Sequence, residues 1–311
     1  MERVRRLVRA QDVYRYGIYG KNIGIAVLDT GIYAGHPDFD HRVTGFQDVL
    51  HHRRNPYDDC SHGTHVSSII GGSGRMSGGK YMGIAPECHL IQVKVLDEKG
   101  NGSKEDVLAG IAWVLKNKER YGIRIMNISV GTVRESRQRD IQLVEAVEKA
   151  WDAGLVVVVA AGNMGPEPMS ITVPGNSKKV ITVGSYDDCT LKGRGRKGQS
   201  CYSGTGPTAE CICKPDLVAP GSGIVACSSL SAQKGRAFYC KKSGTSMATP
   251  VVSGAIALLL SQEPGLTNAE VKIRLRESAV DLHLPQNRQG WGKLDVKNLL
   301  FDTSWKKFFL T

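Results

Sequence analysis

The sequence has no apolar run long enough to cross a membrane. The longest one, Val251–Leu260, is about half of the ~20 residues that a membrane-spanning helix needs. A secretory signal is also missing, because neither an apolar stretch nor a small-residue cleavage site follows the basic start MERVRRLVRA. We therefore expect no membrane partner and a cytoplasmic location.

Cysteine is scarce for a chain of this length. Eight cysteines in 311 residues, with no Cys-x-x-Cys pair, are too few for a disulfide scaffold. Cys189, Cys201, Cys211 and Cys213 could together ligate a metal, but their spacing fits no zinc pattern. We therefore expect ordinary free thiols and no metal ion.

Acidic residues are outnumbered, 30 Asp and Glu against 41 Lys and Arg, which gives a net charge of +11. The basic residues are spread along the chain, and no DNA- or RNA-binding motif accompanies them. We expect no nucleic-acid partner, and a basic surface that favours acidic ones.

Short apolar runs rich in β-branched residues alternate with longer amphipathic stretches. Continuous runs such as Leu155–Val159 are typical of strands buried on both faces of a parallel sheet. The alternation predicts an α/β fold with a doubly wound, mainly parallel central sheet and helices on both faces. The expected strands are Ile23–Leu28, His89–Val95, Ile123–Ser129, Leu155–Ala161 and Val180–Gly184, and the expected helices are Gly63–Ile70, Lys104–Lys116, Arg137–Ala153, Met247–Leu260 and Asn268–Ser278.

The chain shows no internal repeat and no linker rich in proline or serine. We therefore predict one domain over residues 1–311, with a short N-terminal extension at 1–9. Only 6% of the residues are aromatic, yet several gather in the C-terminal tail 301–311. This clustering predicts that the tail docks on the body or on a second subunit.

Three short segments carry side chains suited to covalent catalysis. Asp29 follows an apolar strand, His62 opens an apolar helix, and Ser246 stands directly before another apolar helix. A serine at such a place lies beside free backbone N–H groups and the positive end of the helix dipole. Taken singly, Asp29-Thr-Gly31 is also common turn chemistry, and His62 with His65 could face a metal, although a third ligand of matching spacing is missing.

The chain order Asp29, His62, Ser246 is that of subtilisin-type serine peptidases, and the surrounding motifs resemble the subtilase family, close to its intracellular bacterial branch. The resemblance implies a serine endopeptidase in which Ser246 attacks the scissile carbonyl, His62 moves the proton and Asp29 orients His62. By the same resemblance, the Asn163 amide and the Ser246 backbone N–H would stabilise the oxyanion. The matching segments include AVLDTGI, HGTHVSSIIGG, NISVG, VVVVAAGN, KPDLVAPG and GTSMATPVVSGAIALLL.

The resemblance also implies that a protein or peptide substrate binds as an added strand. Thr172 would lie at the floor of the first specificity pocket, and the uncharged pocket walls predict an apolar residue before the cut. The residues expected to bind substrate are Gly100, Asn101, Gly102, Ser129, Val130, Gly131, Ala160 and Gly162.

Secreted members of the family hold a tight calcium ion in a loop after the histidine helix. The matching stretch Ser73–Lys80 has no carboxylate and two cations, which makes it a poor site for a hard cation. We expect no cofactor for the chemistry and no tight calcium site, while a structural calcium ion elsewhere stays open. Intracellular relatives pair, so a homodimer also stays open.

Two other functions compete with this interpretation. An α/β-hydrolase esterase would need the order Ser, Asp, His, and only Asp281 and His283 follow Ser246, too close together to form a triad. A non-catalytic binding or regulatory protein of the subtilase fold would have lost at least one of Asp29, His62, Asn163 or Ser246, and all four are present.

Overall fold

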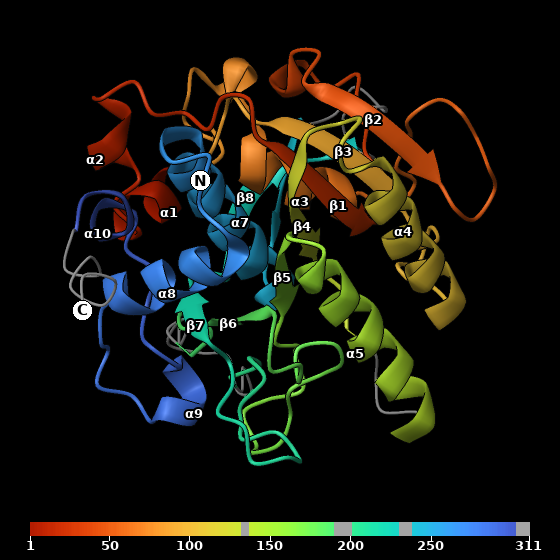
Figure 1. The fold of residues 1–311 in the computed structure, drawn as a ribbon. Helices are drawn as coiled ribbons and strands as arrows, with labels where there is room; N and C mark the ends of the chain where they lie inside the picture. Colours follow the sequence, from red (N-terminus) through yellow and green to blue (C-terminus); the bar gives the residue numbers. More distant parts are fainter. Residues whose placement is uncertain (132–136, 190–200, 230–237, 303–311) are drawn as a thin grey trace, which may run out of the picture.

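A seven-stranded parallel sheet forms the centre of the molecule. The computed structural model describes residues 1–131, 137–189, 201–229 and 238–302 (Figure 1). The strand order is β2-β3-β1-β4-β5-β6-β7, and all neighbours are parallel. The strands are β1 (Gly24–Asp29), β2 (Val43–Asp48), β3 (His89–Lys94), β4 (Ile123–Ile128), β5 (Val156–Ala160), β6 (Ile181–Ser185) and β7 (Leu217–Ala219).

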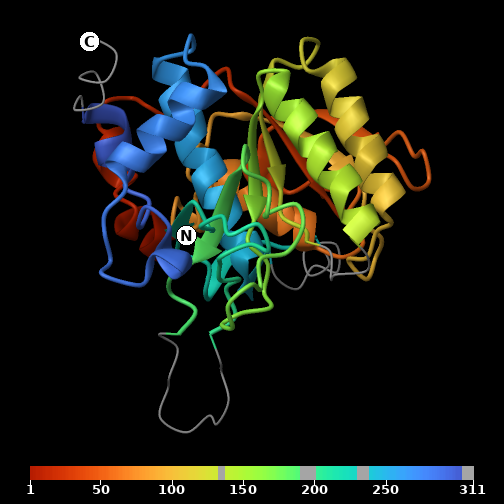
Figure 2. The same cartoon turned by 60° about the horizontal axis from the view of Figure 1, so that its bottom comes forward.

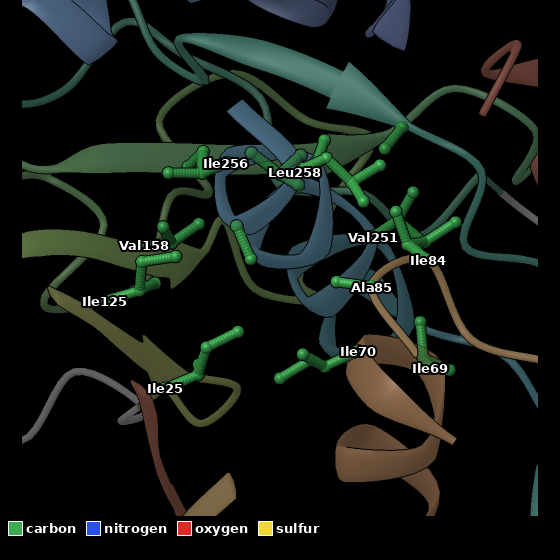
Figure 3. Close-up of a cluster of buried hydrophobic side chains, with 14 of the residues drawn as sticks. Ile25, Ile69, Ile70, Ile84, Ala85, Ile125, Val158, Val251, Ile256 and Leu258 are labelled. Carbon is green, nitrogen blue, oxygen red and sulfur yellow. The ribbon is translucent and has the colours of Figure 1, made fainter. Parts of the chain in front are cut away.

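Helices cover both faces of the sheet because the strands are apolar on both sides. Ile25 and Val27 of β1 pack in the same core as α3 (His62–Gly71) and α7 (Thr245–Gln262). Figure 3 shows side chains of α7 and α3 gathered against strand residues of this core. Ala26 and Leu28 point the other way, into the core under α4 (Lys104–Asn117) and α5 (Arg137–Asp152). Figures 1 and 2 show α4 and α5 side by side.

The prediction of a doubly wound α/β fold is confirmed, and each expected strand and helix is present with both ends within two residues of the predicted ones. Four strands were missed. Two are β2, an only partly buried edge strand, and β7, which is three residues long. The others are β8 (Ile224–Cys227) and β9 (Tyr239–Lys242), which form a separate antiparallel pair.

The N-terminal residues are part of the body rather than an extension from it. They form α1 (Glu2–Leu7), and Met1, Val4 and Val8 are buried in the main core. Alternation rules for strands and long helices do not detect so short a helix. The remaining short elements are α2 (Gln11–Tyr14), η1 (Pro37–Phe39), η2 (Arg75–Ser77), α8 (Asn268–Ser278), α9 (Gln286–Gln289) and α10 (Val296–Phe301).

The helix α7 is long and apolar enough to span a membrane by composition, but 83% of that stretch is buried inside the protein. It is therefore the central core helix. It begins at Thr245, two residues before the predicted start, so Pro250 lies in its second turn and not in its first. Since proline has no N–H, it cannot donate to the carbonyl oxygen of Ser246, four residues earlier.

The expectation that all cysteines are free thiols is wrong for two of them. Cys189 and Cys201 form a disulfide, with their Cα atoms 4.8 Å apart. The two cysteines are 12 residues apart in the sequence, and this spacing alone does not indicate that they pair. The other cysteines are free.

Most of the aromatic tail lies outside the described residues. Within them, the ring of Phe301 packs edge-on against Tyr16, with ring centroids 5.0 Å apart.

Candidate active site

The carboxylate of Asp29 and the imidazole of His62 face each other at the carboxyl end of the sheet. Asp29 is the last residue of β1 and fully buried, and His62 is the first residue of α3. Asp29 Oδ1 lies 2.7 Å from His62 Nδ1 and accepts a further hydrogen bond from the backbone N–H of Thr30. Gly63 allows this approach, because a Cβ there would overlap the carbonyl oxygen of Gly31.

The environment of His62 raises its pKa. Burial alone would lower the pKa of this imidazole, but the negative charge of Asp29 and its hydrogen bond outweigh burial. Lys242 acts against Asp29 and lowers the same pKa. Asp29 therefore orients the ring through Nδ1, and the pKa of the imidazole lies above its ordinary value.

Ser246 is the second residue of α7 and lies half-buried at the open end of that helix. Its backbone N–H is among the first four of the helix, which have no acceptor within it. Its Oγ donates a hydrogen bond to the carbonyl oxygen of Ser129, 2.8 Å away. Among the hydrogen bonds of the described residues, none joins Ser246 Oγ to His62 Nε2.

Asn163 is held against the start of the same helix. Its Oδ1 accepts hydrogen bonds from the backbone N–H of Thr245 at 2.9 Å and from the Thr245 hydroxyl at 3.1 Å. Because Oδ1 is used in this way, the Nδ2 hydrogens are the part of the amide left to bind an anionic oxygen. The exposed Asn163 amide and the Ser246 N–H thus form two donors of the kind an oxyanion needs.

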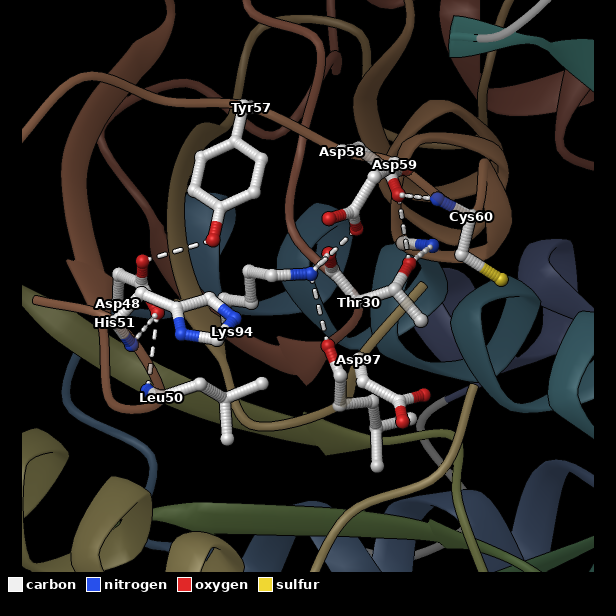
Figure 4. Close-up of polar contacts among 12 residues, drawn as sticks. Thr30, Asp48, Leu50, His51, Tyr57, Asp58, Asp59, Cys60, Lys94 and Asp97 are labelled. Carbon is white, nitrogen blue, oxygen red and sulfur yellow. Dashed lines mark hydrogen bonds and ion pairs between the residues drawn. The ribbon is translucent and has the colours of Figure 1, made fainter. Parts of the chain in front are cut away.

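A buried carboxylate, Asp58, joins the segment that follows Asp29 to the segment that begins with His62, and Figure 4 shows it beside Thr30 and Cys60. It accepts hydrogen bonds from the backbone N–H groups of Ser61 and Thr64 at 2.8 and 2.9 Å, and so caps α3. It also accepts the Thr30 hydroxyl at 2.9 Å, and Thr30 Oγ1 in turn accepts the Gly63 N–H. The residue after Asp29 and the residue after His62 are therefore joined through one carboxylate and one hydroxyl.

Lys94, the last residue of β3, binds the segments that follow β1 and β3. Its fully buried Nζ donates to the carbonyl oxygens of Thr30 and Leu96 and to Asp59 Oδ1, at 2.7, 2.9 and 2.7 Å (Figure 4). Sequence reasoning missed both Asp58 and Lys94 as positioning residues. An acidic residue a few positions before a helix start was the available signal for Asp58, whereas a lysine ending a strand gave none.

Ser129–Gly131 follows β4, and its first residue accepts the hydrogen bond from Ser246 Oγ. Asn127 holds this segment, because its Nδ2 donates to Ser129 Oγ at 2.9 Å and its Oδ1 accepts from Ser253 at 2.8 Å. Thr172 lies between the two pocket walls: a Cβ on either Gly131 or Gly162 would collide with its hydroxyl. Gly162 has φ +91°, which favours glycine. Two of the predicted substrate-binding residues, Gly131 and Gly162, therefore both approach the Thr172 side chain.

The segment Gly100–Gly102 is exposed and leads into α4. It is not a strand, because Asp97 holds residues 97–101 in a turn: its carboxylate accepts the N–H of Asn101 at 2.8 Å. In the part of the chain that the structure describes, no strand pairs with 100–102. Cys60 lies close by, with its sulfur 3.8 Å from the place a Gly100 Cβ would take.

The stretch Ser73–Lys80 surrounds a guanidinium. Arg5 is 5% exposed, and its side chain donates to the carbonyl oxygens of Gly79 and Met82, the former at 2.9 Å. Asp38 Oδ1, which also faces this loop, accepts the backbone N–H of Met76 at 2.9 Å. The oxygens that a cation would use here are thus bound to donors of the chain itself.

Comparisons with known proteins agree with this geometry. The profile of the Subtilase family matches residues 20–292. Serine protease AprX of Bacillus subtilis (strain 168) is 43% identical over 282 residues, which cover 86% of this chain and 64% of AprX. Subtilisin DY of Bacillus licheniformis is 32% identical over 278 residues, which cover 89% of this chain and 90% of that protein.

A solved structure, that of a cold adapted subtilisin-like serine proteinase, superposes with a TM-score of 0.70 at 29% identity and covers 90% of each chain. Together with the parallel sheet and the residues that meet at its edge, these matches confirm the predicted family and fold. The chain belongs to the subtilase family, whose named members here are serine proteases and subtilisins.

Proposed function

We propose that this chain hydrolyses internal peptide bonds of proteins through Asp29, His62 and Ser246. The observation that carries the proposal is the 2.7 Å contact of the fully buried Asp29 carboxylate with His62 Nδ1, in a fold whose core helix α7 has Ser246 as its second residue. Ser246 Oγ attacks the scissile carbonyl while His62 Nε2 takes its proton. His62 then gives the proton to the leaving amine, and water releases the acyl group by the same two steps.

The oxyanion of each tetrahedral intermediate is bound by Asn163 Nδ2 and the Ser246 N–H. The substrate enters as an extended segment between Gly100–Gly102 and Ser129–Gly131, where the exposed Gly100, Gly102 and Gly131 allow an added strand to approach the backbone closely. An apolar residue occupies the pocket above Thr172, since Gly131, Ala160 and Gly162 bring no charge to its walls.

No metal ion takes part in this mechanism. The residues of the loop that would hold calcium in secreted relatives do not fit that ion, because the Arg5 guanidinium supplies the positive charge there.

The proposal is tested by comparing the wild type with Ser246→Ala, His62→Ala and Asp29→Ala on a peptide library derived from a proteome. We expect each variant to stay folded and to lose nearly all hydrolysis, with losses that do not add, because the three residues act as a unit. A fluorophosphonate probe should label the wild type at Ser246 only. A folded Ser246→Ala protein with wild-type turnover would overturn the mechanism, and the absence of labelling would favour a non-catalytic role.

A further inference from the structure

A lysine on β9, Lys242, acts on the charge of His62 and has no function in the mechanism above. The strand β9 pairs with β8 and ends at Lys242, four residues before Ser246. Side chains alternate along a strand, so Cys240 and Lys242 are on one face and Lys241 is on the other. The Cys240 thiol lies against the hydroxyls of Ser61 and Ser228, and Ser61 directly precedes His62.

This face of β9 therefore packs on the start of α3. A second contact fixes it there, because His65 Nε2, one turn after His62, lies 3.2 Å from both the Cys240 and the Ile224 carbonyl oxygens. Lys242 continues the same face toward the catalytic residues. Lys241 is exposed and lies over Gly223, where a Cβ would be 3.0 Å from Lys241 Cε.

The charge of Lys242 reaches the active site and is not balanced there. Its ammonium lowers the pKa of His62 and that of Cys60. The nearby carboxylates are already engaged, Asp29 by His62 and Asp58 by the N-terminus of α3. Among the described residues, no ion pair involves Lys242. A half-buried cation that forms no ion pair among the described residues suits an anionic ligand.

The position of Lys242 relative to the scissile bond follows from the residues around it. Thr172, Gly131 and Gly162 form the pocket for the residue before the cut, on the β4 and β5 side of Ser246. His62 must reach the leaving amine, so the chain after the cut departs on the side of α3 and β9. Lys242 belongs to that side.

We propose that Lys242 selects substrates with an acidic residue directly after the scissile bond. This inference rests on the proposed peptidase function and adds a substrate class to it. The apolar pocket selects only the residue before the cut, and Lys242 would select the residue after it. The carboxylate of Asp or Glu pairs with the Lys242 ammonium as the substrate binds and the leaving group develops.

Three peptides that differ only in the residue after the cut, Glu, Gln or Lys, with Leu before it, test the proposal. We expect wild-type kcat/KM to favour Glu over Gln by about 3- to 10-fold, as for a partly exposed ion pair. The ratio should fall to one in Lys242→Gln, reverse in Lys242→Glu, and shrink with added salt. Lys241→Gln is the matched control, and it should keep the wild-type ratio because its side chain is on the other face.

Equal wild-type rates for Glu and Gln, or an unchanged ratio in Lys242→Gln, would overturn the proposal. The proposal would also fail if Lys242→Gln lowered kcat/KM for all three peptides by the same factor, since Lys242 would then act only through its effect on the charge of His62. Melting curves verify that the variants fold. Failure of the peptidase function is a separate result, because no peptide would be cleaved and no fluorophosphonate would bind.

Discussion

The hydroxyl of Ser246 donates its hydrogen bond to the carbonyl oxygen of Ser129, at 2.8 Å, rather than to His62. That carbonyl belongs to the segment that the proposed substrate strand would join. In the proposed mechanism, Ser246 must therefore rotate about its Cα–Cβ bond before His62 can take its proton. Burial lowers the pKa of His62, and the charge and hydrogen bond of Asp29 raise it by more.

Substitutions at Ser246 and Asp29 should show which of the two residues affects the pKa of His62. We expect Ser246→Ala to leave the titration midpoint of His62 unchanged and Asp29→Asn to lower it, because the Asp29 charge and hydrogen bond raise the pKa. Histidine ring NMR signals, followed against pH, measure both. Since the base is active when neutral, the acid limb of wild-type kcat/KM should lie above the ordinary imidazole value. A large shift in Ser246→Ala would mean that the serine binds His62 in solution.

Asp58 shows where sequence reasoning reached its limit. Asp29, His62, Ser246 and Asn163 lie in motifs that indicate both their chemistry and their place at strand or helix ends. The role of Asp58 depends instead on hydrogen bonds to two segments that are far apart in sequence, which only the folded chain brings together. The contacts of the buried Arg5 with residues 79 and 82, and the Cys189–Cys201 disulfide, likewise become visible only in the folded chain.

Asp58→Asn should lower kcat more than it changes KM. The amide keeps one acceptor but loses the charge that holds Thr30 and the N-terminus of α3, so His62 is positioned less precisely. We expect a loss of about 1–3 kcal/mol in the free energy of unfolding. Asp106→Asn is the matched control, since Asp106 belongs to the exposed capping box of α4 and its loss should reduce stability without reducing kcat. Equal kcat losses in both variants would contradict a positioning role.

Thr172 should limit the size of the residue before the cut. The wild type is expected to prefer Leu, Met or smaller aliphatic residues to Trp, because the threonine lies between Gly131 and Gly162. Thr172→Gly should increase kcat/KM for Phe relative to Leu about 10-fold, the effect of a methylene or more of added space. Peptides varied at this one residue measure the ratio. A dominant preference for Arg or Asp before the cut would refute the apolar pocket.

Arg5 should make the fold independent of calcium. Its guanidinium binds the carbonyl oxygens of the loop 73–82, so Arg5→Met leaves buried acceptors without donors. At about 1–3 kcal/mol for each such group, and about 2–4 °C for each kcal/mol, Tm should fall by several degrees. EDTA should leave the Tm of the wild type unchanged. A marked fall in the wild-type Tm with EDTA, reversed by added calcium, would show that a calcium ion stabilises the protein after all.

Cys60 should make the enzyme sensitive to thiol reagents. It is half-buried, two residues before His62, and close to Gly100 at the proposed substrate segment. Burial and the charge of Asp58 raise the pKa of its thiol, so modification should be slow at neutral pH and accelerate as the pH rises. A mercurial or maleimide bound there would lie against the His62 ring and the substrate path, and should therefore abolish peptide hydrolysis.

Cys60→Ser should be active and largely protected, and Cys211→Ser, which removes an exposed free thiol, should be inhibited like the wild type. Mass spectrometry of the partly inhibited enzyme assigns the modified residue, and the loss of activity should follow the occupancy of Cys60. If Cys60→Ser is inhibited as strongly as the wild type, another cysteine is responsible. The thiol beside His62 would then be too well covered to react, and Cys60 would not border the open cleft.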